Sequence, residues 1–119
     1  MMIDILARLE EAIEGNRQLD KRIDALVTPD RYLIPIDGSI PIVLGHYICP
    51  DYTTSIDAAL LLLPEGCAWS LSRSITFNCE AIVYGHDLHE SMDAATPALA
   101  FSGAGLKARA ALRAYLAFR

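Results

Sequence analysis

The stretch ATPALAFSGAGLKARA, residues 95 to 110, predicts a helix that lies inside the molecule. Thr96 is a typical N-cap residue, and Pro97 suits the first helical position because its missing N–H would have no helical partner there. Apolar side chains occur on nearly every side, as far as about residue 117. Gly103 and Gly105 would each cost about 1 kcal/mol relative to alanine in an exposed helix. We therefore expect this helix to lie between a sheet and another layer, with its small residues allowing close packing.

A β-hairpin is predicted before that helix. Trp69 and Leu71 alternate with serines, and apolar and polar residues continue to alternate as far as Val83. A period of two residues is typical of a strand with one buried face. We expect strands near 67–73 and 77–84, followed by a polar loop over 85–95.

The segment PDYTTSIDAALLLLPEG, residues 50 to 66, predicts a short helix over 55–63. Thr54 to Asp57 fits a capping box, in which the Thr54 hydroxyl would accept a hydrogen bond from the N–H of Asp57. We expect this helix to bury Ile56, Ala59, Leu60 and Leu63. The run of hydroxyl residues could also suggest a nucleophile, but no histidine lies nearby and no GxSxG elbow is present. The hydroxyls are interpreted as a helix start.

The N-terminal part predicts a helical hairpin. Apolar residues recur at three- and four-residue steps over 2–14 and again over 17–27. Gly15 suits the position just after the first helix, and Asn16 is a good N-cap for the second. Further on, residues 40–48 are apolar and β-branched, which favours a strand, and Pro41 would place it at a sheet edge.

The length of 119 residues indicates one domain that spans residues 1–119. The predicted helices and strands place this domain in the α+β class. The expected parts are a small, mostly antiparallel sheet, the N-terminal helical hairpin and a long C-terminal helix. Hydrophobic residues make up 53% of the chain and charged residues 21%. A small domain with this much apolar surface is expected to cover part of it with a partner, either a second copy or another protein.

The cellular compartment is predicted from what the sequence lacks. No run approaches the roughly 18 apolar residues of a membrane span, and the first residues do not resemble a targeting segment. We expect the protein to remain in the cytoplasm. Its three cysteines, Cys49, Cys67 and Cys79, are expected to be reduced thiols.

Charge is unevenly distributed along the chain. The net charge is −5, residues 37–93 carry eight acids and one base, and residues 94–119 carry bases but no acid. Such a chain could pair with itself, and its acidic total argues against nucleic acid as the main partner. The candidate interface lies on the last helix, at Gly103, Lys107, Arg109, Arg113 and Tyr115.

The sequence predicts no catalytic residue, no cofactor and no metal site. Two alternatives stay open. His46, Cys49, His86 and His89 have the residue types and pairwise spacing of zinc ligands, so a small metal-dependent hydrolase around His86 and His89 is one alternative. A regulator that binds nucleic acid through the basic last helix is the other.

Several segments together resemble the phage α/β/α-sandwich domain family. They are YTTSIDAALLLLPEG (52–66), CAWSL (67–71), ATPALAFSGAGLKARA (95–110) and GNRQLDKRI (15–23). Family members often have a tryptophan directly after PEG, whereas here Cys67 and Ala68 precede Trp69, and Gly103 stands at a position where a bulkier residue or a cysteine is usual. The resemblance implies a three-layer α/β/α sandwich and a phage- or prophage-related origin, and it implies no activity. We therefore expect a non-enzymatic structural or protein-interaction module, most simply a homo-oligomer.

Overall fold

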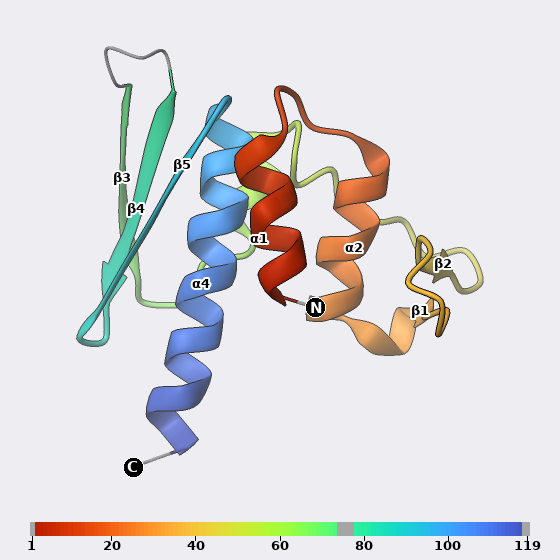
Figure 1. The fold of residues 1–119 in the computed structure, drawn as a ribbon. Helices are drawn as coiled ribbons and strands as arrows, with labels where there is room; N and C mark the ends of the chain where they lie inside the picture. Colours follow the sequence, from red (N-terminus) through yellow and green to blue (C-terminus); the bar gives the residue numbers. More distant parts are fainter. Residues whose placement is uncertain (1, 74–77, 118–119) are drawn as a thin grey trace.

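The computed structural model describes residues 2–73 and 78–117 (Figure 1). The helices are α1 (Met2–Glu11), α2 (Arg17–Val27), the 3-10 turn η1 (Pro29–Arg31), α3 (Ile56–Leu60) and α4 (Pro97–Ala117). The strands are β1 (Tyr32–Leu33), β2 (Ile42–Val43), β3 (Ala68–Arg73), β4 (Cys79–Gly85) and β5 (Leu88–Ala94). These elements confirm the α+β class, the antiparallel sheet, the N-terminal helical hairpin and the long C-terminal helix.

Helix α4 is the central element of the fold. It packs against β4 and β5 on one side and against α1 and α3 on the other, and Thr96 caps it by accepting a hydrogen bond from the Leu99 N–H at 3.3 Å. Its glycines permit close approach, because a Cβ at Gly103 would overlap the Sδ of Met92. A Cβ at Gly105 would lie 3.0 Å from that of Leu62. The predicted tight packing of this helix is therefore confirmed, and it occurs within the chain.

The three-stranded sheet has the order β3-β4-β5, with Trp69 paired to Val83 and Val83 to Glu90. The side chains that face α4 include Ala81, Val83, Met92 and Ala94, all buried. Ser70 and His89 are exposed on the opposite face. Figure 1 shows the sheet followed by α4 and α1, then by α2. The sheet is thus the outermost layer, and the helices gather on one of its faces.

The prediction of a polar loop over 85–95 is wrong, because most of this segment forms strand β5. A two-residue turn joins β4 to β5, and both of its residues, His86 and Asp87, have positive φ (52° and 62°). Turns of this kind suit the twist of a tight hairpin. The strand was missed because polar Glu90 lies on the inner face and hides the alternation.

Helix α3 starts one residue later than the capping box predicts and ends sooner. The hydroxyl of Ser55, rather than that of Thr54, accepts a hydrogen bond from the Ala58 N–H at 3.2 Å. The prediction that Ile56 is buried is wrong, since its side chain is exposed. Ala58, Ala59 and Leu62 are the buried residues of this segment, because they face α4.

The helical hairpin has the predicted second helix and a shorter first one. Asn16 caps α2, and its side chain accepts a hydrogen bond from the Leu19 N–H at 2.8 Å. Helix α1 ends at Glu11, so Gly15 is not its C′ residue. A Cβ at Gly15 would overlap the carbonyl group of Thr53, which explains why glycine is needed there.

The strand predicted over 40–48 is reduced to the two residues of β2. Ile42 pairs with Leu33, and Val43 pairs with Tyr32, to form a short antiparallel ribbon. Figure 1 shows this ribbon beyond α2, on the side away from the sheet.

None of the described helices is long and apolar enough to cross a membrane.

Candidate functional site

A buried carboxylate on α2 organises the region around the ribbon. Asp24 is fully buried and accepts hydrogen bonds from three phenols: Tyr32 and Tyr47 at 2.7 Å, and Tyr52 at 2.6 Å. We call these four residues the Asp24 cluster. Hydrogen bonds to a carboxylate are stronger than those between neutral groups. The cluster therefore fixes both ends of the segment 32–52 to one helix.

A second buried carboxylate holds the segment that follows. Asp20, one helical turn before Asp24, accepts hydrogen bonds from the N–H and the hydroxyl of Thr53 at 2.8 and 2.7 Å. Arg17 also binds Asp20, at 3.0 Å, and donates to the Cys49 carbonyl at 2.8 Å. The hydroxyl of Thr53 thus binds α2 and does not cap a helix, so the interpretation as a helix start holds for Ser55 and not for Thr53.

The tyrosines of the Asp24 cluster and the neighbouring Cys49 thiol have raised pKa values. Burial, followed by hydrogen bonds to Cys49 and Asp24, raises the pKa of Tyr32 far above its ordinary value. Burial and the hydrogen bond to Asp24 raise the pKa values of Tyr47 and Tyr52 in the same way. Burial also raises the pKa of the Cys49 thiol, which lowers its thiolate fraction. At neutral pH these groups stay protonated and serve as hydrogen-bond donors or packing groups.

The residues held by the Asp24 cluster form the candidate site. We call residues 32–48 the arm. Its exposed large apolar side chains are Leu33, Ile34, Ile36, Ile42, Leu44 and Ile48. Ile48 is 83% exposed, although large aliphatic side chains are usually buried. Tyr32 and Tyr47 meet edge to face with ring centroids 6.0 Å apart, which stiffens the base of the arm.

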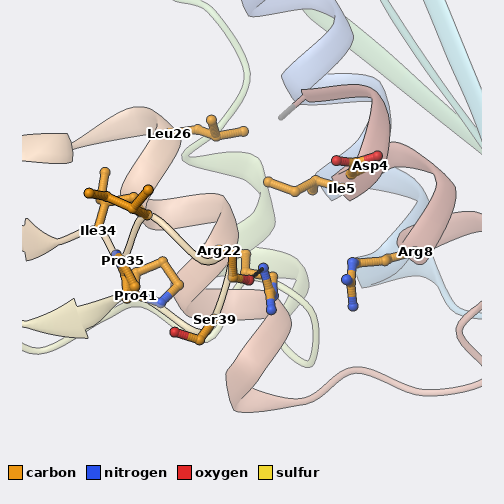
Figure 2. Close-up of a pocket in the computed structure, with 12 residues that line it drawn as sticks. Asp4, Ile5, Arg8, Arg22, Leu26, Ile34, Pro35, Ser39 and Pro41 are labelled. Carbon is orange, nitrogen blue, oxygen red and sulfur yellow. Dashed lines mark hydrogen bonds between the residues drawn. The ribbon is translucent and has the colours of Figure 1, made fainter.

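Two hollows lie beside the arm and beside α4. The first has a volume of about 350 Å³ and lies between α1, α2 and residues 34–41, with Arg8 and Arg22 in its wall (Figure 2). The second has a volume of about 410 Å³ and lies where α4 meets the start of α1 and the end of α2. We call it the α4 groove; its lining includes Met2, Val27, Leu106, Arg109, Arg113 and Ala117.

The structure spreads the predicted interface residues over different environments. Gly103 lies inside the chain against Met92, and Lys107 donates to the Ser91 carbonyl at 2.9 Å. Arg109 and Arg113 line the α4 groove, and Tyr115 is partly exposed. Of the five predicted interface residues, Arg109 and Arg113 therefore lie together, in the α4 groove.

The four potential zinc ligands do not form a site. His86 lies at the β4–β5 turn, with its Nε2 atom 2.8 Å from the Glu65 carbonyl oxygen. Cys49 is buried near Tyr32, whereas His46 and His89 are exposed. Within residues 2–73 and 78–117, no group of three histidine, cysteine, aspartate or glutamate side chains is placed to hold a metal ion.

Sequence reasoning missed the Asp24 cluster and the arm. A signal was present, because Asp20 and Asp24 follow the apolar residues Leu19 and Ile23 on the inner side of α2. Three of the chain's five tyrosines also fall within residues 32–52.

Comparisons with known proteins add nothing to this geometry: no family model, curated protein or solved structure matches the chain.

Proposed function

We propose that this chain is a non-enzymatic protein-interaction module that binds a second copy of itself through the arm. The observation that carries the proposal is the set of exposed isoleucine and leucine side chains on a segment held in place by the buried Asp24 cluster. Burial of these side chains in a contact would stabilise the complex by roughly 25 cal/mol per Å² of apolar surface. Several exposed large apolar side chains on one segment are typical of a surface that binds another protein.

The α4 groove supports a second copy as the partner. It is lined by apolar residues and carries Arg109 and Arg113. The arm carries Asp37 beside the exposed Ile36. Hydrogen bonds from Ser39 lower the pKa of Asp37, so its carboxyl group is ionised at neutral pH. Arm and groove are therefore complementary in both apolar character and charge.

A reciprocal arrangement would let each arm occupy the α4 groove of the other copy. Such an interface has two-fold symmetry and closes on itself, as is usual for homodimers. The uneven charge along the sequence, acidic over 37–93 and basic after 94, favours the same pairing.

The remaining features of the proposal rest on sequence and cysteine chemistry. All three cysteines are free thiols, which supports a reducing compartment such as the cytoplasm. A phage- or prophage-related origin rests on the family resemblance alone and stays a prediction. In the described residues, no observation favours the alternative metal-dependent hydrolase or the nucleic-acid regulator.

Charge reversal tests the proposed contact by light scattering and sedimentation. Arg113→Glu and Asp37→Lys should each shift the protein toward monomer, because each places like charges across the interface. The double variant Asp37→Lys/Arg113→Glu restores opposite charges and should recover self-association. High salt should weaken the wild-type complex, since exposed charge pairs are screened.

Two further variants provide controls and a possible contradiction. Leu44→Ser should also reduce self-association, whereas Leu61→Ser, an exposed leucine after α3, should not. Ser70→Lys places a charge on the exposed edge strand β3 and should leave the oligomer intact. A wild-type monomer at high concentration, or an oligomer lost only in Ser70→Lys, would refute the arm as the contact.

A further inference from the structure

We propose that the hollow between α1, α2 and residues 34–41 binds a small amphiphilic oxyanion, with a carboxylate or phosphate head and an aliphatic chain. This inference does not depend on self-association through the α4 groove. The site is built by three segments far apart in sequence. Arg8 comes from α1, Arg22 from α2, and Ile34 and Ser39 from the arm (Figure 2).

The two arginines supply the recognition of an anion. Figure 2 shows the guanidinium groups of Arg8 and Arg22 turned toward one another from opposite walls. Arg22 donates to the Gly38 carbonyl at 3.2 Å, and no described residue forms a hydrogen bond or ion pair with the Arg8 guanidinium. Each guanidinium has five N–H donors in a fork that matches carboxylate and phosphate oxygens. An oxyanion between them would use guanidinium donors that have no partner among residues 2–73 and 78–117.

The rest of the wall fits an aliphatic chain. Ile5, Leu26, Ile34, Pro35 and Pro41 line the hollow, and Figure 2 shows Ile5 and Leu26 above the arginines. A volume of about 350 Å³ is near the lower end of small-molecule pockets, roughly 300–1,000 Å³. The occupant is therefore a small molecule with a chain of medium length.

One acid, Asp4, also lines the hollow. Figure 2 shows its carboxylate beyond Ile5, apart from the two guanidinium groups. The two arginines outnumber this carboxylate, so the site favours a negatively charged head. A cationic amphiphile of the same chain length tests this selectivity directly.

Calorimetric titration of the full chain with decanoate and with decyl phosphate tests the proposal. Both should bind, whereas decanol and decyltrimethylammonium should bind at least about tenfold more weakly, since a hydrogen bond to a charged group is lost. Arg8→Gln should weaken decanoate binding by a similar factor and leave decanol unchanged. Arg109→Gln, which alters a different surface, is the matched control. Binding of decanoate but not decyl phosphate, or the reverse, assigns the head group.

Methyl NMR spectra of the same samples locate the ligand. Decanoate should shift the signals of Ile5 and Ile34, which line this hollow and not the α4 groove, and these shifts should be lost in Arg8→Gln. Because no described residue forms a hydrogen bond or ion pair with the Arg8 side chain, this variant should retain the wild-type melting temperature. Equal affinity for decanol and decanoate, or no effect of Arg8→Gln, would overturn the proposal. Shifts confined to Ile48 and Leu116, two exposed residues that do not line the hollow, would overturn it as well.

Discussion

At the scale of single residues, the buried phenols make the stability of this protein depend on pH in the alkaline range. The native pKa values of Tyr32 and Tyr52 are raised, mainly by burial, whereas phenols in the unfolded chain ionise near pH 10. Above about pH 10 the unfolded chain releases protons that the native protein retains. The unfolding free energy should then fall by about 1.4 kcal/mol per pH unit for each phenol that stays protonated. The stabilisation is fully present below that pH and is lost as the pH rises.

Urea unfolding between about pH 8 and pH 11 measures this dependence. Tyr52→Phe removes one phenol, so the unfolding free energy of this variant should fall less steeply with pH than that of wild type. At neutral pH the variant should be less stable by about 1–3 kcal/mol, because the hydrogen bond to Asp24 is lost. Tyr84→Phe alters an exposed residue and should leave the free energy at neutral pH within about 0.5 kcal/mol of wild type. An unchanged alkaline slope in Tyr52→Phe would show that this phenol does not stay protonated in the native protein.

At the scale of elements, the contact between α4 and β5 depends on the absence of a side chain at Gly103. Gly103→Ala should destabilise the protein by about 1–3 kcal/mol, because the added methyl group overlaps the side chain of Met92. This cost exceeds the gain of about 1 kcal/mol that alanine brings to a helix. Met92→Ala should also destabilise, by about 2–5 kcal/mol, since it leaves a cavity.

The double variant Gly103→Ala/Met92→Ala distinguishes internal packing from an external contact. With Met92 truncated, the methyl group at position 103 has room, so the double variant should be more stable than the sum of the single effects predicts. Chemical denaturation of the four proteins gives this coupling energy. Additive effects, together with a change in oligomeric state for Gly103→Ala alone, would instead place Gly103 at an interface between copies.

The elements that could be predicted from sequence are those with local signals. Thr96-Pro97 and Asn16 start α4 and α2 as expected, because capping depends on the first turn alone. Strand β5 could not be predicted, since its pairing with β4 overrides a pattern in which Glu90 faces inward. The Asp24 cluster joins α2 to tyrosines eight to 28 positions later. Such contacts follow from tertiary packing and leave no periodic pattern in the sequence.

At the scale of the whole molecule, the arm and the core are held together by different interactions. The main apolar cluster includes residues from α1, α2, α3, α4 and the three-stranded sheet, whereas Tyr32 and Cys49 at the base of the arm belong to a separate small cluster. Most of the arm's large apolar side chains contribute little to the core, because they are exposed. Self-association and folding should therefore be separable by changes in the arm.

Replacement of residues 34–41 by Asn-Gly tests this separation. Leu33 and Ile42 are paired, and Asn-Gly is the preferred two-residue connection for such a hairpin, so Tyr32, Tyr47 and the Asp24 cluster should remain in place. The shortened chain lacks Ile34, Ile36 and Asp37 and should sediment as a monomer at concentrations where the full chain associates. Its free energy of unfolding should stay within about 1 kcal/mol of that of a wild-type monomer, because the removed side chains are mostly exposed. A shortened chain that unfolds, with the Asp24 hydrogen bonds lost, would show that the arm is part of the folding core, whereas a shortened chain that still associates would place the contact elsewhere.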